Sequence, residues 1–526
     1  MTDLNVSRLV EDIYDGRIEL PDFQRDFVWK PEQVRELLVS VLADYFIGSL
    51  LILEQITKEA FFALRYVAGV EEVNPDVQKP TMVKILLDGQ QRASALFYAL
   101  YEPEINLRHT KPCRFYLDLG KALNKEWDKA VISVKINDRR KLEGISKNSD
   151  IVSFSLLRDI GAFAMKYSKD PRCNDMIKLV NDFMKREIHY VPLRRETEPN
   201  RIVETFERIN RTGEVLSIFD LATARLYKFD IKLRDMLDEA KKEYAVVSAA
   251  PPEFILKVIA LIRGEETKRK SILELEPKDF KTHWGRACEA LQLAFTRVTD
   301  QKHGYGVLKF KKWMPYTPMI VPLAGMINLL RVEKIETKKN YDKIDRWYWS
   351  SVFSTRYDEA ADTKSETDFK SLKQWFTKDS KIPEFIQGFK PDEVDLEVDR
   401  QSSAIYRGVM GMIVLNGAFD FMTGQPPQFD EEKVQDDHVF PKVIYKFNRI
   451  SNRTLITSNA KKGDDKPSKY FKKILDLHGK EKFTEILESH LIPEDAFGYL
   501  LHDQLKKFVE KRKEAIITDL ENRIMH

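Results

Sequence analysis

The chain has 526 residues, which is enough for about three domains of ~150 residues and for a large buried core. Its composition, 43% hydrophobic and 32% charged, is that of a soluble globular protein that needs no disulfide staples. The net charge of only +3 excludes a uniformly basic chain, so any nucleic-acid site requires a local cluster of basic residues.

The cysteines and the apolar segments bear on the cellular compartment. Cys113, Cys173 and Cys288 form no CxxC pair, which argues against a disulfide framework and a cysteine-ligated zinc site and fits a reducing cytoplasm. The N-terminal residues are acidic and lack the apolar run of a signal peptide. The longest apolar stretch, 319–330, is too short to span a bilayer. We therefore expect a cytoplasmic protein without a membrane partner.

The N-terminal block, residues 1–235, is predicted to mix helices and strands. Pro31 suits the first turn of a helix, and apolar residues recur after it at helical spacing. A short buried strand is expected at 47–53. Later in the block, we expect a strand at 188–193, a helix at 201–210, and a further helix that Ser217 and Asp220 cap.

Residues 236–395 are predicted to be mostly helical. The segment 345–357 within them is unusually aromatic, and we expect its large rings to pack in the core rather than to stack on bases. Residues 396–526 are expected to form a third domain that ends in a long amphipathic helix. Together, these blocks predict a multidomain α+β protein.

A strand–turn–helix unit within residues 81–100 contains the first polar motif, DGQQR (88–92). A strand is expected to end at Asp88 and Gly89, and a helix to start near Gln91. The N–H groups at a helix start favour an anion, and Arg92 could bind phosphate oxygens through two donors. Read alone, the motif is equally compatible with a tight turn and an ion-paired arginine. Two further polar turns, at 23–25 and 206–217, favour a binding site.

The second polar motif is DDHVFPK (436–442), which Asn452, Asn459 and Lys462 follow. Hydrolysis of a phosphodiester needs a base near neutral pH, a role that suits His438, and a divalent cation that oxygen ligands hold. The spacing fits a strand with Asp-His, a second strand at 453–458 and a helix at 467–475. This is a ββα-metal arrangement. Six lysines between 461 and 473 would favour contact with a phosphate backbone.

The segments LPDFQRDFVW, ILLDGQQRASAL and FERINRTGEVLSIFDLATARL occur in this order. They resemble the N-terminal GmrS-like domain of GmrSD-type modification-dependent (type IV) restriction systems, a relative of the ParB and sulfiredoxin fold. The resemblance covers most of residues 1–235 and implies nucleotide binding and hydrolysis. No Walker motif is present, so a P-loop NTPase is not expected. The residues implied are Asp88, Gly89, Gln90, Gln91, Arg92, Gln24 and Arg25.

The C-terminal motif resembles the HNH nucleases of the GmrD-like domain. This resemblance implies that His438 is the general base, that Asp437 and Asn459 hold the metal, and that Asn452 braces the loop or the histidine. Lys462 would assist the phosphate, and Lys461, Lys466 and Lys469 would contact DNA. Two alternatives stay open: Asp436 competes with Asp437 for the metal, and Asn452 and Asn459 could exchange roles.

These resemblances imply a DNA endonuclease that depends on, or is regulated by, a nucleoside triphosphate and that nicks or cuts modified foreign DNA, such as phage DNA. Glucosylated hydroxymethylcytosine and phosphorothioate DNA are both candidate marks. The implied cofactors are Mg²⁺ or Mn²⁺ and ATP, GTP or another nucleotide, and a homodimer is one option. The alternatives are a toxin that cleaves RNA and a nucleotide-gated DNA-binding regulator with an inactive HNH fold.

Overall fold

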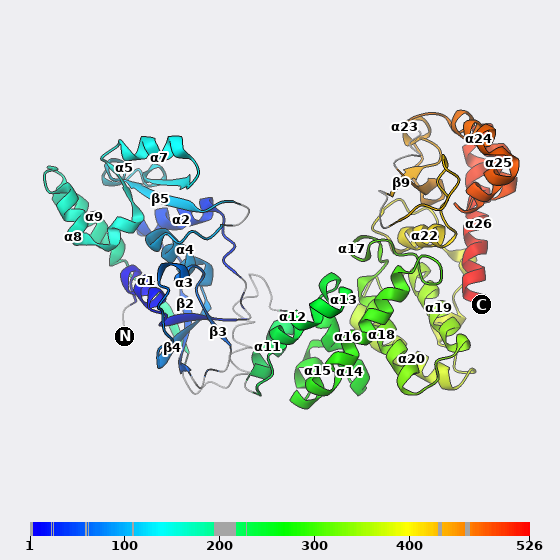
Figure 1. The fold of residues 1–526 in the computed structure, drawn as a ribbon, viewed down its shortest axis with the longest axis horizontal. Helices are drawn as coiled ribbons and strands as arrows, with labels where there is room; N and C mark the ends of the chain where they lie inside the picture. The colour runs from blue at the N-terminus through cyan, green and yellow to red at the C-terminus, as the bar shows by residue number, and fades with distance from the viewer. Residues whose placement is uncertain are drawn as a thin grey trace. The chain divides into compact units, whose positions relative to one another are not determined.

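The computed structural model describes residues 4–22, 24, 26–57, 60, 63–107, 110–193, 217–227, 229–429, 434–457 and 463–525. Contacts between residues divide the chain into two compact units, Met1–Lys232 and Leu233–His526 (Figure 1). Each unit has a hydrophobic core of its own, and the expected multidomain α+β class is confirmed. No helix within the described ranges is long and apolar enough to cross a membrane.

The first unit is built on a sheet of β1 (Ile18–Pro21), β2 (Leu50–Ile56), β3 (Leu64–Tyr66), β4 (Met82–Asp88) and β8 (Tyr190–Leu193). The strand order is β3-β1-β4-β2-β8. Strand β4 runs parallel to β1 and antiparallel to β2, and β2 runs parallel to β8. The strand expected at 47–53 starts later, because Gly48 adopts a left-handed turn (φ 83°) just before β2.

Side chains of β2 and β4 alternate between the two faces of this sheet. Ile52 and Leu86 pack in the larger core, whereas Leu53 and Ile85 pack in a smaller cluster with Ala224. One face therefore contacts α1 (Val6–Tyr14), α2 (Pro31–Leu42) and α4 (Gln90–Tyr101), and the other contacts α11 (Ile218–Tyr227).

Local sequence signals set the starts of these helices. Helix α2 begins at Pro31, as predicted, and α4 begins at Gln90, beside the predicted start. The predicted cap of α11 is also present: the Ser217 hydroxyl donates to Asp220 Oδ2 at 2.6 Å, and the Asp220 N–H donates to Ser217 Oγ at 3.1 Å. The helix predicted at 201–210 lies outside the described residues.

A smaller antiparallel sheet extends the first unit. Strand β5 (Cys113–Asp118) lies between β6 (Val131–Lys135) and β7 (Ile151–Ser153). Phe115 and Leu117 of β5 join the same core as α4, so the two sheets share one apolar interior. The other helical elements are α3 (Val70–Val73), α5 (Leu119–Leu123), α6 (Trp127–Ala130), α7 (Arg139–Ser146), η2 (Phe154–Arg158), α8 (Ile160–Tyr167) and α9 (Cys173–Met184).

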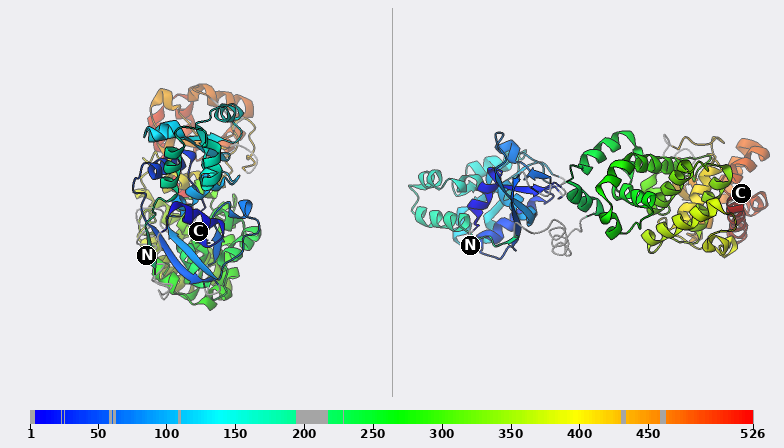
Figure 2. Two further views of the ribbon diagram at one scale, coloured as in Figure 1. Left: turned by 90° about the vertical axis from the view of Figure 1, so that its left-hand side faces the viewer. Right: turned by 90° about the horizontal axis from the view of Figure 1, so that it is seen from below.

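The second unit begins with a helical part, as predicted for 236–395. Figure 2 shows these helices in green, and α14, α16 and α18 pack against one another. Trp347 is 0% exposed and Phe353 is 3% exposed, which confirms that the aromatic segment belongs to the core. The main helices are α12 (Leu233–Glu243), α13 (Ala245–Ala249), α14 (Glu253–Arg263), α15 (Arg269–Glu274), α16 (Pro277–Thr299), α17 (Phe310–Trp313), α18 (Ile320–Val332), α19 (Lys338–Phe353), α20 (Ala361–Thr377), α21 (Glu384–Gln387) and α22 (Ala404–Leu415).

The C-terminal part of this unit contains a two-stranded hairpin. Its elements are β9 (Gln435–His438), α23 (Lys442–Tyr445), η6 (Ile450–Asn452), β10 (Arg453–Ile456), α24 (Pro467–Glu488), α25 (Phe497–Leu501) and α26 (Leu505–Met525). The expected terminal helix starts only at Leu505, because the chain turns at Asp503 (φ 58°). Helix α26 packs along α19, where the Arg523 guanidinium lies 5.5 Å from the centre of the Trp349 ring.

Candidate functional site

The motif DDHVFPK begins on the β9–β10 hairpin. His438 lies opposite Arg453 in the antiparallel register, and Asp437 lies opposite Thr454. Neighbouring residues of a strand point to opposite faces, so His438 shares one face with Asp436, and Asp437 belongs to the other. Asp437 and His438 were expected to act together, but they therefore lie on different faces of β9.

The imidazole of His438 has a polar partner at each ring nitrogen. Nε2 lies 2.8 Å from Asn448 Oδ1, and Nδ1 lies 3.5 Å from Arg453 Nη1. An amide oxygen only accepts and a guanidinium only donates, so these contacts assign the proton to Nε2 and make Nδ1 the acceptor. Arg453 Nη2 also donates to Asn448 Oδ1 at 3.1 Å. The resulting neutral imidazole is the form that a general base requires.

Asp436 is bound by donors from three side chains. Gln401 Nε2 donates to its two oxygens at 2.9 and 2.8 Å, the Tyr406 hydroxyl donates to Oδ2, and Arg453 Nη1 lies 3.1 Å from Oδ2. Burial, and then the hydrogen bond to Asp436, raise the pKa of Tyr406 well above its usual 10, so the hydroxyl remains a donor. Asp436 thus neutralises the arginine beside His438.

Asp437 is partly buried near α24. The pKa of Tyr470 on that helix is raised, chiefly by burial and further by the charges of Asp420 and Asp437. Within the described ranges, no three His, Cys, Asp or Glu side chains gather closely enough to hold a metal ion. Asn459, the other expected ligand, lies outside these ranges.

Asn452 braces the loop between the two strands. Its side chain is fully buried, and its Oδ1 accepts from the Phe440 N–H at 2.8 Å. Its Nδ2 donates to the Phe440 carbonyl at 2.9 Å and to the Phe447 carbonyl at 3.0 Å. These bonds fix the loop 439–447, and Asn448, the next residue, contacts His438.

Two buried residues support the other side of the hairpin. Arg512 of α26 is 0% exposed and donates to the carbonyls of Ser451 and His490 at 3.1 and 3.0 Å, and burial lowers its pKa to about 9. His490 Nδ1 lies 2.6 Å from Thr454 Oγ1, and its Nε2 lies 2.8 Å from the Phe419 carbonyl. Contacts from Arg512 and His490 therefore stabilise the hairpin, in addition to the pairing of its own two strands.

The lysines expected at the phosphate are only partly described. Lys461 and Lys462 lie outside the described residues. Lys466, at the start of α24, and Lys469 are exposed, and Lys469 Nζ lies 2.7 Å from Asp465 Oδ1. The described lysines therefore leave their ammonium groups accessible to an anion from solution.

The DGQQR turn joins β4 to α4. Gly89 has a φ of 89°, and a Cβ there would lie 2.1 Å from Leu50 Cδ2, so the turn requires glycine. Arg92 Nη1 donates to the Ile47 carbonyl at 2.6 Å, and its Nη2 donates to the Ser49 carbonyl at 3.0 Å and lies 3.5 Å from Asp88 Oδ2. Arg92 thus tethers the loop before β2.

Two buried glutamines tie a neighbouring loop to the same turn. Gln24 Nε2 donates to the carbonyls of Leu86 and Leu87, both at 2.9 Å. Gln91 accepts from the Val28 N–H and donates to the Asp26 carbonyl, both at 3.0 Å. Gln90 is also buried. The structure therefore places Gln24 beside the end of β4 that leads into DGQQR, whereas Phe23, Arg25 and the polar turn at 206–216 lie outside the described residues.

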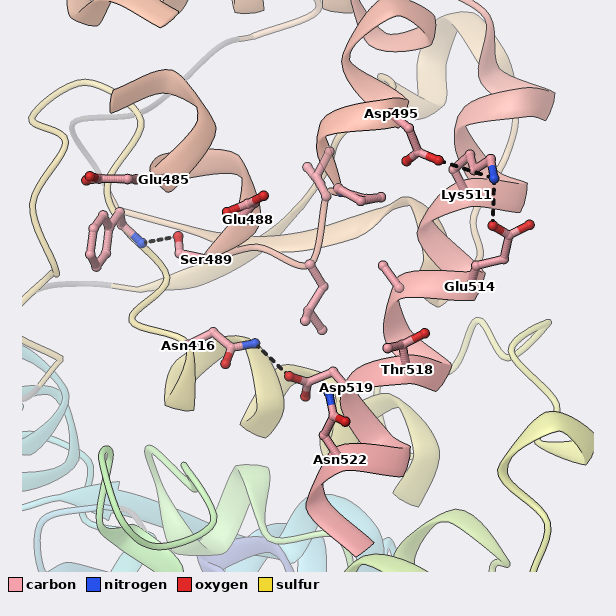
Figure 3. Close-up of a pocket in the computed structure, with 15 residues that line it drawn as sticks. Asn416, Glu485, Glu488, Ser489, Asp495, Lys511, Glu514, Thr518, Asp519 and Asn522 are labelled. Carbon is pink, nitrogen blue, oxygen red and sulfur yellow. Dashed lines mark hydrogen bonds and ion pairs between the residues drawn. The ribbon is translucent and has the colours of Figure 1, made fainter. Parts of the chain in front are cut away.

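Two pockets lie apart from both motifs. One, of about 860 Å³, lies between α24 and α26, where Lys511 joins Asp495 at 3.2 Å and Glu514 at 2.8 Å (Figure 3). Its excess of carboxylates, which includes Glu485 and Glu488, disfavours a phosphate ligand. The other, of about 1090 Å³, is lined by α2, α5 and α9. Neither pocket contains a residue of the hairpin or of the DGQQR turn.

Sequence reasoning missed Asn448, Arg453, Arg512 and His490. Asn448 and Arg453 lie close to the motif along the chain, but neither belongs to the His–Asn–Asn–Lys spacing that drew attention to it. Arg512 lies on the terminal helix and contacts the hairpin segment at Ser451. A contact between residues so far apart along the chain has no local signal in the sequence. For Arg453 there was one usable signal. If residue 453 starts the second strand of the hairpin, the alternation of side chains along that strand puts Arg453 on the same face as His438.

Comparison with known proteins gives two findings. Residues 6–227 match the family described as the N-terminal domain of the GmrSD restriction endonuclease. The chain is also similar to an uncharacterized protein of Methanocaldococcus jannaschii, with 31% identity over 582 aligned residues that cover 98% of this chain and 97% of the relative. The family match contains the main sheet of the first unit and ends before the second unit.

Proposed function

Because the chain belongs to the GmrSD restriction endonuclease family, we propose that it is a nucleotide-regulated DNA endonuclease that restricts modified foreign DNA, such as phage DNA. Nuclease activity and DNA as a partner follow from the family. The proposal adds that the β9–β10 hairpin cleaves and that the DGQQR turn belongs to a nucleotide site. The observation that carries it is the imidazole of His438, which has a polar partner at each ring nitrogen.

In this proposal His438 is the general base. Hydrolysis requires a water to lose a proton while its oxygen attacks phosphorus and the O–P bond to the leaving oxygen breaks. Nδ1 is the acceptor nitrogen, since Nε2 donates to Asn448. The proton arrives near Arg453, whose charge Asp436 offsets at 3.1 Å. The imidazole therefore does not face an uncompensated cation when it becomes charged.

A divalent cation, Mg²⁺ or Mn²⁺, would be held by Asp437 and Asn459, since hard cations take carboxylate and amide oxygens. When bound, it would stabilise charge on the leaving oxygen. The resemblance to HNH nucleases assigns the metal to Asp437, and the contacts of Asp436 with Gln401, Tyr406 and Arg453 give Asp436 the separate role of offsetting the arginine charge. The contacts favour Asn459 over Asn452, because Asn452 uses its amide to brace the loop.

The cations around the hairpin would neutralise the DNA backbone. We assign Lys462 to the phosphate at the cleaved bond and Lys461, Lys466 and Lys469 to flanking phosphates. The exposure of Lys466 and Lys469 at the start of α24 supports this, because exposed ammonium groups can replace the counterions of DNA.

The nucleotide site is assigned to the DGQQR turn with Gln24 and Arg25. The first N–H groups of α4 suit an anion, and Gly89 supplies the positive φ that turns the chain from β4 into this helix. Asp88 and Arg92 lie at the rim of the turn, where 33% and 22% of their side-chain surfaces are exposed. Arg92 would exchange its bonds to the Ile47 and Ser49 carbonyls for phosphate oxygens, so nucleotide binding would release the loop before β2.

The test is a cleavage panel with Mg²⁺ and purified full-length protein. The substrates are unmodified, glucosylated-hydroxymethylcytosine and phosphorothioate DNA, with matched RNA, each with and without each nucleoside triphosphate. We expect cleavage of one modified DNA, loss of cleavage in His438→Ala and normal cleavage in His502→Ala, a control at an exposed histidine of the same unit. Cleavage of RNA with DNA left intact would replace this proposal with the toxin.

A second comparison tests the metal ligand. Asp437→Ala is expected to abolish Mg²⁺-dependent cleavage, whereas Asp436→Asn should lower the rate and leave its dependence on Mg²⁺ concentration unchanged. An unaltered Mg²⁺ dependence in a folded Asp437→Ala protein would remove Asp437 from the metal site.

A further inference from the structure

Helix α7 has no buried side chain, unlike the other helices of eight or more residues in the described part of the first unit. It follows β6, an edge strand of the smaller sheet (Figure 1). Between residues 135 and 147 the chain has five basic and two acidic side chains. Burial of side chains in the core therefore does not explain why this exposed, basic helix is present.

The basic side chains of this segment are mostly unpaired. Lys141 Nζ lies 3.7 Å from Asp138 Oδ2. Lys135, Arg139, Arg140 and Lys147 form no ion pair with any residue in the described part of the chain, and all four are exposed. Unpaired cations that gather on one short segment form a positive surface that attracts an anionic polymer.

One face of α7 combines two of these cations with a glycine. Arg140, Gly144 and Lys147 follow at helical spacing and share one side, where Glu143 is the one acidic neighbour within α7, whereas Leu142 and Ile145 turn their half-buried side chains elsewhere. A Cβ at Gly144 would meet no atom within 4 Å. Glycine destabilises a helix relative to alanine, and here no neighbour among the residues that the structure describes requires it. The open space at Gly144, between Arg140 and Lys147, can therefore accommodate part of a ligand that is not in this chain.

We propose that this surface, the α7 face (Arg140, Gly144 and Lys147, with Arg139 and the β6 residue Lys135 beside it), binds the phosphate backbone of DNA. Arginine and lysine bind phosphate by charge, and the missing side chain at Gly144 lets a sugar–phosphate strand lie against the helix. The inference rests on the proposed function for the choice of DNA as partner. Such contacts carry no sequence information, so the α7 face holds any DNA while other residues read the modification.

The test measures the binding of full-length protein to a fluorescent DNA duplex over a range of salt concentrations. The variant Arg140→Glu/Lys147→Glu is compared with Lys166→Glu/Lys169→Glu, which makes the same charge change at two exposed lysines in and after α8. We expect the first to weaken binding at least about tenfold and to reduce the slope of log K against log salt by about two, since each lost phosphate contact lowers it by about one. The second should bind normally.

A third variant, Gly144→Gln, tests the close approach without changing the charge. It is expected to weaken binding at least about threefold without lowering the thermal unfolding temperature, because its side chain enters open space and a helical glycine is replaced by a residue with higher helix propensity. Equal affinity and salt slope for the two charge-reversed proteins would overturn the proposal. Binding of the wild type to phosphatidylserine vesicles and not to DNA would overturn it as well.

The outcome separates this inference from the proposed function. If the wild type cleaves DNA but the α7 variants bind and cleave normally, only the α7 face is wrong. If the α7 variants lose binding but the wild type cleaves no DNA, only the nuclease assignment is wrong.

Discussion

At the level of single residues, the imidazole of His438 is fixed by an amide on one side and a guanidinium on the other. Asn448 accepts from Nε2, and Arg453 points a donor at Nδ1. The arginine is in turn neutralised by Asp436. In the proposed role of general base, His438 would gain from such an environment, since the ring keeps one tautomer and one orientation.

We predict that Asn448→Asp moves the acidic limb of the pH–rate profile for DNA cleavage to higher pH. The new carboxylate stabilises the protonated imidazole, so a higher pH is needed to produce the neutral base. Asn448→Ala should lower kcat about tenfold or more, because the ring loses its orientation, and should leave DNA affinity unchanged. An unshifted limb in Asn448→Asp would show that Asn448 does not contact the base during the reaction.

A second prediction concerns His490 and acid stability. Burial lowers the pKa of His490 from the usual 6.5 to about 4. The unfolded chain therefore binds the proton first, and stability is complete above pH 6.5 and decreases as the pH falls from 6.5 towards 4. The loss is about 3 kcal/mol for a shift of this size. Hydrogen exchange of β10 across this pH range measures it.

The matched variants for this measurement are His490→Gln and His502→Gln. Glutamine can still hydrogen-bond to Thr454 but does not titrate, so the pH dependence should disappear in His490→Gln. His502 is exposed, and its replacement should leave the dependence as in the wild type. Identical pH dependence in all three proteins would contradict the assignment to His490.

At the level of elements, the strand–turn–helix from β4 to α4 was predictable, because each of its parts leaves a local signal. Alternating apolar residues mark β4, and Asp-Gly marks the turn. The two strands of the C-terminal hairpin were also expected, although β10 ends at Ile456. The contacts of Arg92 with the loop before β2 were not predictable in detail, since they join residues more than forty positions apart.

We predict that Gly89→Ala destabilises α4 and its turn by at least about 1–2 kcal/mol. The φ of 89° is unfavourable for alanine, and the added Cβ would overlap Leu50. Gly285→Ala in α16 is the control: its Cβ meets no atom within 4 Å, so we expect stabilisation by about 0.5–1 kcal/mol. Hydrogen-exchange protection of each helix reports the change, and equal effects of the two substitutions would contradict the strained turn.

At the level of the whole molecule, the two polar motifs belong to different compact units. DGQQR lies in Met1–Lys232, and the hairpin lies in Leu233–His526. Each unit has its own core, so a substitution at one motif does not disturb the packing around the other. Communication between nucleotide and nuclease would then require a change that passes from one unit to the other.

This separation predicts opposite phenotypes for two variants. His438→Ala should abolish DNA cleavage and keep nucleoside triphosphate hydrolysis, whereas Arg92→Ala should abolish hydrolysis and keep basal metal-dependent cleavage. Both activities are measured on the same preparations, with thermal unfolding as the check of folding. Loss of both activities in a folded His438→Ala protein would contradict independent sites.

The sequence by itself determined the mixed architecture, the positions of both motifs and the resemblance of the N-terminal block to its family. These follow from local periodicity, turn residues and short ordered motifs, which neighbouring residues encode together. Only the tertiary structure decided which side chains surround His438, that Asp436 is already bound by Gln401, Tyr406 and Arg453, and that Asn452 braces a loop. Those contacts join distant segments through packing, and packing has no local signal.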